Sequence, residues 1–174
     1  MDAALARLMN RLGAGVIDPF TDMLCAVWFL AALWPATVAV GVWALSSGRR
    51  QLLLRVLIAG VLFLLCNELL LKHGLGLFRL RPYLADPQIV PIGYRFTDSS
   101  FPSSHAASTA ALATVLGHAH RRFAAIGVGL VALMDFARVH DGMHYPSDVL
   151  IGTLLGVAYA AVAIVCVERF AKSS

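Results

Sequence analysis

The chain has 174 residues, of which 59% are hydrophobic and only 14% carry a formal charge. Soluble domains carry about 25% charged residues, so a globule of this composition would expose a large apolar surface to water. The mean hydropathy of +0.77 agrees with this. The composition excludes an ordinary water-soluble domain, a disordered tail and a fibrous repeat, and it favours one membrane-embedded domain over residues 1–174.

Charge and cysteine content narrow the class further. The formal net charge is +4, but the cations are too sparse to form a nucleic-acid-binding patch. Cys25, Cys66 and Cys166 lie in apolar runs with neither paired nor metal-ligand spacing. The N-terminus lacks the cleavage site of a signal peptide. We therefore expect the lipid bilayer as a partner, and neither nucleic acid nor a metal.

The first 20 residues form a separate segment. Apolar side chains recur there at helical spacing, arginines occupy other positions, and Asp18-Pro19 predicts a break. This pattern favours an amphipathic helix in the membrane interface, with a frayed tail and a further membrane span as alternatives. The apolar positions are Leu5, Leu8, Met9, Leu12 and Val16.

Five apolar stretches follow, and each approaches the length of about 20 residues that a spanning helix needs. They comprise residues 21–45, 52–71, 105–117, 123–139 and 149–167. The third is short, and its flank extends it to residue 120. The expected fold is an all-α integral membrane bundle of five to six transmembrane helices with an interfacial helix over residues 1–20.

The positive charges divide into two groups on opposite sides of the predicted bundle. One group lies in short loops and at the C-terminus, which the positive-inside rule assigns to the cytoplasm of a plasma (inner) membrane. The other faces the periplasm or exterior, where topology does not require cations, so its members are candidates for binding an anion. The first group comprises Arg49, Arg50, Arg121, Arg122, Arg169 and Lys172, and the second Lys72, Arg79, Arg81, Arg95 and Arg138.

Residues 72–82 are the first of three outer segments suited to phosphate chemistry. They contain Lys72, Arg79 and Arg81, whose ammonium and guanidinium groups match the charge and geometry of phosphoryl oxygens. The alternative is a set of interfacial anchors that contact lipid headgroups.

Residues 102–105 are the second segment, and they directly precede an Ala-rich helical run. The free amides of a helix's first turn and the hydroxyls of Ser103 and Ser104 are suited to an anion. His105 would stand beside that anion and exchange a proton with it near neutral pH. A simple helix cap with an incidental histidine is the alternative.

Residues 138–148 are the third segment. His144 and Asp148 are four residues apart at a helix start, so they share a face. A carboxylate that holds one imidazole nitrogen leaves the other nitrogen free as a nucleophile. Arg138 ends the preceding span and would reach the same pocket. A His–Asp pair that only caps the helix is the alternative.

Together the three segments resemble the type 2 phosphatidic acid phosphatase superfamily, the lipid phosphate phosphatases, over roughly residues 50–168. The family's second motif, Pro-Ser-Gly-His, stands here as 102–105 with Ser104 in place of Gly. The third motif stands as Arg138-x5-His144-x3-Asp148, with Ala in place of the Ser that precedes Arg138.

The first family motif, Lys-x6-Arg-Pro, is altered in this chain. Eight residues separate Lys72 from Arg81-Pro82, whereas Arg79 keeps the family spacing but lacks the following proline. We favour Arg81 as the phosphate-binding arginine, with Arg79 as the alternative.

The resemblance implies a metal-independent, cofactor-free phosphatase reaction. His144 would attack phosphorus to form a phosphohistidine, Asp148 would orient His144, and His105 would protonate the leaving oxygen and then activate water. The phosphoryl oxygens would be held by Lys72, Arg81, Arg138, Ser103 and the amides near Ser104. Phosphoryl transfer depends mainly on charge neutralisation and placement, which these groups supply.

Two acidic residues in the predicted spans are expected to support the site. Glu68 lies four residues before Lys72 and Asp135 three before Arg138, so each carboxylate can orient its neighbouring cation. Generic packing within the bundle is the alternative.

The expected substrate is a membrane lipid phosphate, with undecaprenyl diphosphate as the best fit because its diphosphate is released on the outer face. Phosphatidylglycerol phosphate, phosphatidic acid and lipid A phosphate are open alternatives. A phosphotransferase that uses the same phosphohistidine, or a lipid-binding protein without catalysis, is also compatible with the sequence. The sequence leaves the oligomeric state open.

Overall fold

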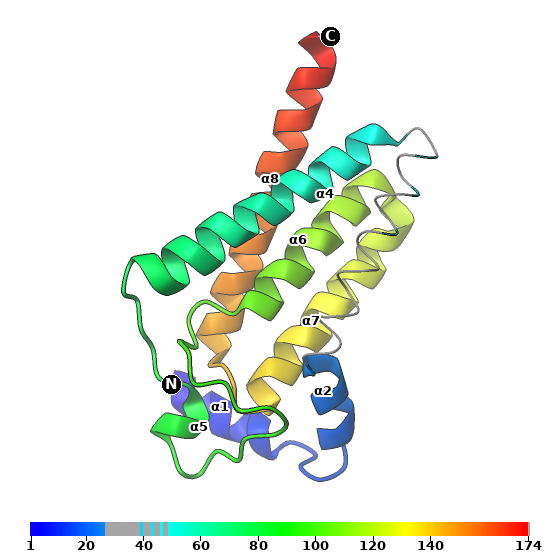
Figure 1. Cartoon of the computed structure of the whole chain (residues 1–174). Coiled ribbons are helices and arrows are strands. Elements are labelled where there is room, and N and C mark those ends of the chain that lie inside the picture. Colours follow the sequence, from blue (N-terminus) through cyan, green and yellow to red (C-terminus); the bar gives the residue numbers. More distant parts are fainter. Residues whose placement is uncertain (27–38, 40–42, 44–45, 47–48, 174) are drawn as a thin grey trace.

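The computed structural model describes residues 1–26, 39, 43, 46 and 49–173, and every regular element within them is helical (Figure 1). This agrees with the expected all-α class. The elements are α1 (Asp2–Arg11), α2 (Asp18–Cys25), α4 (Arg50–Leu62), η1 (Phe63–Gly74), α5 (Pro82–Ala85), α6 (Ser104–Ala119), η2 (Arg121–Phe123), α7 (Ala124–His140) and α8 (Pro146–Ser173).

Three helical stretches in the described part of the chain are long and apolar enough to cross a membrane: residues 50–74, 121–140 and 146–172. They correspond to three of the five expected spans. The expected span 21–45 lies mostly outside the described residues. α6 has 16 residues and is therefore about 24 Å long, shorter than the hydrocarbon core of about 30 Å.

α4 and η1 form one continuous helix, but η1 is wound more loosely, in the π-helical manner. The amide of Leu75 closes η1 by donating to the carbonyl of Leu70, five residues back, at 2.8 Å. Asn67 is fully buried in this segment. Wide π turns occur mostly at functional sites, and this one carries Glu68 and Lys72 to the start of α6.

α6 runs through the middle of the bundle and packs mainly on α8 and α7. Small residues allow this close approach. A Cβ on Gly152 would lie 2.6 Å from the carbonyl oxygen of Ser103, and one on Gly156 would lie 2.9 Å from the carbonyl carbon of Ala107. The start of α6 is thereby held against the first turns of α8.

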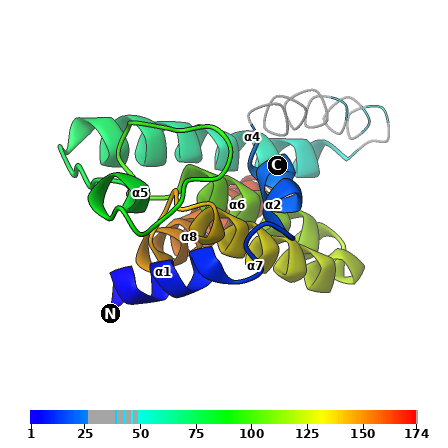
Figure 2. The same ribbon diagram turned by 90° about the horizontal axis from the view of Figure 1, so that it is seen from below.

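α1 lies across the end of the bundle that carries the loops, against α7 and α8 (Figure 2). Asn10 fixes it there: its side-chain amide donates to the carbonyl of His140 at 2.6 Å and accepts from the amide of Val90 at 3.0 Å. Gly142 follows α7 with a φ of +71°, a backbone conformation that favours glycine, so the chain turns there toward α8. The N-terminal helix and the loops therefore share one end of the molecule.

Replacing Gly156 by Ala is expected to push α6 and α8 apart and to destabilise the protein by about 1–3 kcal/mol, the usual cost of overpacking. Thermal unfolding in detergent, followed by circular dichroism, measures this loss. Gly129→Ala is the matched control, because a Cβ at Gly129 on α7 meets nothing within 4 Å and alanine favours a helix. Equal shifts in the two variants would contradict close packing at Gly156.

Candidate active site

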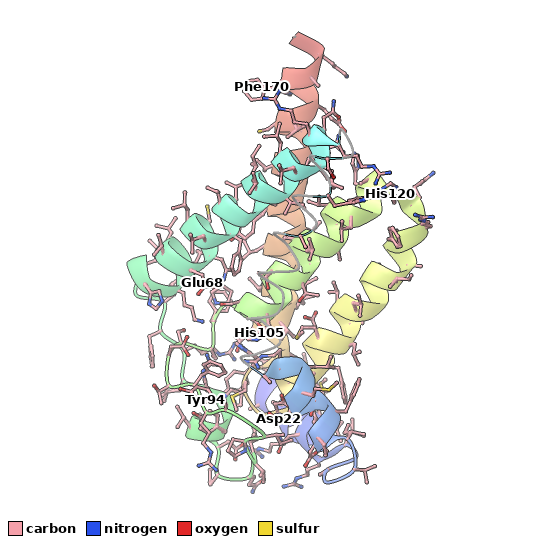
Figure 3. All side chains as sticks on the ribbon, turned by 45° about the vertical axis from the view of Figure 1, so that its right-hand side comes forward. Asp22, Glu68, Tyr94, His105, His120 and Phe170 are labelled. Atoms are coloured by element: carbon pink, nitrogen blue, oxygen red, sulfur yellow. The ribbon has the colours of Figure 1, made fainter. Side chains whose placement is uncertain are left out.

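The three motif segments meet at the end of the bundle where α1 and α5 lie (Figure 1). Lys72 comes from the end of η1, Arg81 from the loop before α5, and His105 from the first turn of α6. Arg138 comes from the last turn of α7, and His144 from the short connection to α8. Figure 3 shows His105 at the lower end of α6, with Glu68 above it and Tyr94 below.

His144 is fully enclosed, and its two ring nitrogens have different surroundings. Nδ1 lies 2.7 Å from the carbonyl oxygen of Ser100, which only accepts, so Nδ1 carries the proton. Nε2 lies 3.3 Å from Nη2 of Arg138 and 3.4 Å from Nη1 of Arg81. Burial lowers the pKa of His144 well below its ordinary value, and the charges of Arg138 and Arg81 lower it further. Nε2 is therefore the unprotonated nitrogen, and its lone pair accepts long hydrogen bonds from two guanidinium groups.

Asp148 does not hold His144 in the way the resemblance implies. Its nearest oxygen is 4.0 Å from Nδ1 of His144, and the same oxygen accepts the backbone N–H of Tyr145 at 2.9 Å. The other oxygen accepts from Arg79 at 2.6 Å. A carboxylate in the first turn of a helix readily accepts free amides, and the carbonyl of Ser100 takes over the orienting contact.

The two candidate arginines of the first motif have different roles. Arg81 is buried, donates to the carbonyl of Met143 at 3.1 Å and reaches His144, as favoured from the sequence. Among the residues that the structure describes, Arg79 makes no contact with His144. It pairs with Asp148, and its guanidinium carbon lies 3.9 Å from the ring centroid of Tyr145. Arg79 therefore supports the start of α8 and does not face His144.

The first residues of the chain complete this outer network. Asp2 accepts the backbone N–H of Ser147 at 3.1 Å and its hydroxyl at 2.5 Å, and it pairs with Arg79 at 2.7 Å. Asp2 thus caps α8 and holds the arginine that binds Asp148. Nothing in the local sequence pattern indicated this contact, which spans 145 residues.

Lys72 reaches the start of α6 from η1. Its ammonium group donates to the hydroxyl of Ser104 at 3.3 Å, and that hydroxyl donates to Glu68. No direct ion pair joins Glu68 and Lys72 in the described residues, so Ser104 bridges the pair expected from the sequence. The lysine side chain is only 8% exposed and forms an ion pair with Asp98 at 2.8 Å.

The start of α6 leaves polar groups open for a ligand. Ser103 is the N-cap residue of α6, and its side chain makes no cap hydrogen bond. Its hydroxyl, Nε2 of His105 and Nε of Arg138 are buried without a hydrogen-bond partner among the described residues. The charges of Arg138, Lys72 and Arg81 all act on the imidazole of His105. Buried polar atoms without partners are uncommon and indicate a place for a bound group.

Asp135 does not orient Arg138, contrary to the expectation from spacing. Its carboxylate accepts the hydroxyl of Thr153 at 2.8 Å, so it links α7 to α8. A three-residue spacing places Asp135 and Arg138 on one helix face, but the Asp135 carboxylate bonds to Thr153 on the neighbouring helix instead. No group of three His, Cys, Asp or Glu side chains within the described ranges is arranged to hold a metal ion.

The loop between α5 and α6 contributes two residues that sequence reasoning missed. Asp98 pairs with Lys72 and, at 2.6 Å, with Arg81. The ring centroid of Phe96 lies 5.3 Å from the guanidinium carbon of Arg81 and 5.7 Å from that of Arg138. Burial alone would raise the pKa of Asp98, but hydrogen bonds and charges from Lys72 and Arg81 outweigh burial and lower it. Asp98 therefore stays ionised at neutral pH.

Residues 50–172 match the model of the PAP2 superfamily. Decaprenylphosphoryl-5-phosphoribose phosphatase of Mycobacterium tuberculosis is 44% identical over 63 residues, which are 36% of this chain and 34% of that protein. The match thus spans about a third of the length of this relative. The bacitracin transport permease protein BcrC of Bacillus licheniformis is 26% identical over 157 residues, 88% of this chain and 74% of that protein.

The crystal structure of LpxE from Aquifex aeolicus has the same fold. It superposes with a TM-score of 0.71 over 94% of both chains, at 22% sequence identity. The arrangement of helices around the three motif segments is therefore shared with a solved structure, independently of the short stretches of sequence likeness.

We expect His144 in the ligand-free protein to stay neutral as the pH falls through about 6.5, the ordinary pKa of histidine. Burial and the neighbouring guanidinium groups disfavour the charged ring, so protonation should occur only at a lower pH. NMR of ¹⁵N-histidine-labelled protein in detergent measures this, and it should show the Nδ1–H tautomer. His144→Asn identifies the signals. A protonation midpoint at or above 6.5 would contradict the geometry.

Proposed function

The chain belongs to the PAP2 superfamily, and from this membership and the site geometry we propose that it is a membrane-embedded lipid phosphatase acting through a phosphohistidine, without a metal ion. The family resemblance of the three motifs is thereby confirmed. The observation that carries the proposal is the unprotonated Nε2 of His144 between the guanidinium groups of Arg81 and Arg138. A nucleophile held among cations is what attack on an anionic phosphoryl group requires.

In the first step, Nε2 of His144 attacks the terminal phosphorus in line with the bond to its leaving oxygen, which is the bridging oxygen of a lipid diphosphate or the ester oxygen of a lipid monophosphate. The N–P bond forms as the P–O bond breaks, and His105 donates a proton to the leaving oxygen. The negative charge of the bound substrate favours the protonated ring that this step requires. Ser100 accepts the Nδ1–H bond throughout and so stabilises the ring as it gains positive charge. In the second step, water attacks phosphorus while His105 removes its proton, and the N–P bond breaks to release inorganic phosphate.

The phosphoryl oxygens are bound by buried cations and by the start of α6. Lys72, Arg81 and Arg138 supply three positive charges, and the first-turn amides with the hydroxyl of Ser103 supply neutral donors. Arg81 and Arg138 are each only 2% exposed. Charges fixed in such a water-poor site stabilise a developing negative charge more strongly than they would in water.

We assign five spans to the chain, with α6 as the short central one and α1 in the interface. The site and α1 then face the periplasm or exterior, and the C-terminus lies in the cytoplasm. Two observations support this orientation. The site lies at the end of the bundle opposite the C-terminus of α8 (Figure 1). Four cations lie at the starts of α4 and α7 at that opposite end: Arg49, Arg50, Arg121 and Arg122.

The proposed substrate is a polyprenyl-linked phosphate or diphosphate, with undecaprenyl diphosphate as the first candidate. The name of the mycobacterial relative, a phosphatase of a decaprenylphosphoryl compound, supports a polyprenyl carrier. An outward-facing site supports it as well, because a substrate on the outer leaflet reaches this end of the bundle without crossing the membrane.

The reaction is tested with purified protein in detergent and a chelator, offered undecaprenyl diphosphate and phosphatidic acid. We expect inorganic phosphate release from the polyprenyl lipid, and His144→Asn should reduce it by about 10³-fold or more, because the nucleophile is lost. Rapid quenching with ³²P-labelled substrate should trap an acid-labile phosphoprotein in the wild type alone. Release that survives in His144→Asn would refute the nucleophile, and transfer of ³²P to a second lipid would identify a phosphotransferase.

Replacing each arginine of the first motif by Ala should have a different effect on kcat/KM and on thermal stability. Arg81→Ala removes a buried phosphate donor and should lower kcat/KM by about 10²–10³-fold. Arg79→Ala breaks the pair with the partly exposed Asp2 and leaves the fully buried Asp148 without its cation, so it should lower the thermal midpoint. It should cost less than about tenfold in kcat/KM, because Arg79 does not face His144. Steady-state kinetics and thermal unfolding measure both. Larger kinetic damage in Arg79→Ala than in Arg81→Ala would exchange their roles.

A further inference from the structure

Asp98 occupies the place in the site where an anion is expected. One carboxylate oxygen lies 2.6 Å from Nη2 of Arg81 and the other lies 2.8 Å from Nζ of Lys72. The backbone carbonyl of Asp98 accepts a further bond from Nε of Arg81 at 3.1 Å. The carboxylate thus bridges the two cations of the first motif, in the manner of two oxygens of a phosphoryl group.

This contact differs from a structural ion pair because its two partners are unequally buried. The side chain of Arg81 is 2% exposed and that of Lys72 8%, but that of Asp98 is 38% exposed. Asp98 also lies in the loop between α5 and α6, whereas Lys72 is fixed near the end of η1 and Arg81 directly precedes α5. Rotation of the Asp98 side chain therefore exposes the two cations without disturbing the bundle.

Resting on the proposed function, we propose that Asp98 is a resident competing anion, which fills the phosphoryl site until the substrate displaces it and thereby keeps weakly charged headgroups out of the site. Displacement costs the same free energy for every ligand. It therefore raises all dissociation constants by one common factor. This factor matters most for ligands whose own attraction to the cations is small.

The negative charge of a ligand decides whether its attraction to the two cations exceeds the free energy needed to displace Asp98. A carboxylate and a phosphodiester each carry one negative charge, so exchanging one for the other gains little. A phosphate monoester carries about 1.5 to 2 negative charges at pH 7, and the additional charge favours the exchange. The surrounding bilayer presents phosphodiester headgroups at high local concentration. Asp98 would keep these lipids from occupying the site while a monoester or diphosphate still binds.

A second residue of the same loop holds this segment over the cations. The ring of Phe96 lies over Arg81 and Arg138, and the carbonyl of Phe96 accepts the hydroxyl of Tyr83 at 2.8 Å. Cation–aromatic contacts contribute about 0.5–2 kcal/mol, depending on exposure. A ligand can replace the contacts of Asp98 with the cations, whereas the bond from Tyr83 to Phe96 does not involve them. Displacement of Asp98 should therefore loosen the segment at Asp98 while Tyr83 still holds Phe96.

Two ligands with the same chain test the proposal: farnesyl phosphate, a monoester, and farnesyl methyl phosphate, a diester. Their dissociation constants are measured by calorimetry in detergent in a His144→Asn background, so that neither is turned over. Adding Asp98→Asn should tighten both by the same factor, about tenfold or more. In the otherwise native chain, Asp98→Asn should lower KM for farnesyl phosphate and leave kcat within about twofold. Diester lipid added to mixed micelles should then inhibit this variant more strongly than the wild type.

Asp86→Asn is the matched control. Asp86 lies in the same region and pairs with Arg7 on the surface, so its replacement removes the same charge away from the site. We expect its dissociation constants to stay within about twofold of the parent. Weaker binding of both ligands in Asp98→Asn, or a fall in kcat at unchanged KM, would overturn the proposal and make Asp98 a residue that positions Lys72 and Arg81.

A second measurement needs no variant at position 98. Hydrogen exchange of the amides in residues 94–100 is followed in the His144→Asn protein with and without farnesyl phosphate. Faster exchange with ligand supports displacement of Asp98, and slower exchange contradicts it. The calorimetry and the hydrogen-exchange measurement both use the His144→Asn background, so neither depends on turnover.

The two hypotheses can therefore fail separately. If the native chain releases no phosphate, the proposed function is refuted alone. If Asp98→Asn leaves the dissociation constants unchanged, the role of Asp98 as a competing anion is refuted alone.

Discussion

The site depends on positive charge held out of water. Arg81 and Arg138 are almost completely buried with their guanidinium groups directed at one imidazole nitrogen, and Lys72 reaches the same region. Burying cations is costly unless an anion is near. In the ligand-free chain, the carboxylate of Asp98 supplies part of the negative charge that these cations need, and the proposed phosphoryl group would supply more. Burial, together with these charges, holds the pKa of His144 well below its ordinary value. A neutral imidazole is what the proposed nucleophile requires.

The packing of the helices brings these charged side chains to one end of the bundle. The π-wound end of the first described span brings Lys72 toward α6, and glycines on α8 let the start of α6 approach without intervening side chains. α7 and α8 are joined by so short a connection that Arg138 and His144 are brought together. Each cationic group thus lies at the end of a separate helix, and helix packing fixes the distances that phosphoryl transfer needs.

Several features of the site follow from local patterns, and others do not. The composition indicates a membrane bundle, and three motifs predict which histidines, arginines and serines gather at the site. Spacing along a helix does not predict the hydrogen-bond partners of Asp135 and Asp148. It indicates which side chains share a helix face, but not which polar group lies nearest to each carboxylate. Asp135 bonds Thr153 on α8, and Asp148 caps α8 and binds Arg79. The tie from Asp2 to the start of α8 had no local signal.

The sequence by itself determined the class of the protein, the family to which it belongs and most of the groups at the site, because hydropathy and motif spacing are properties of short segments. Only the tertiary structure decided the partner of each group: the Ser100 carbonyl for His144, Arg79 for Asp148, and Asp98 for Arg81. These partners are 44, 69 and 17 residues apart. Their meeting depends on how whole helices pack, which no local pattern encodes.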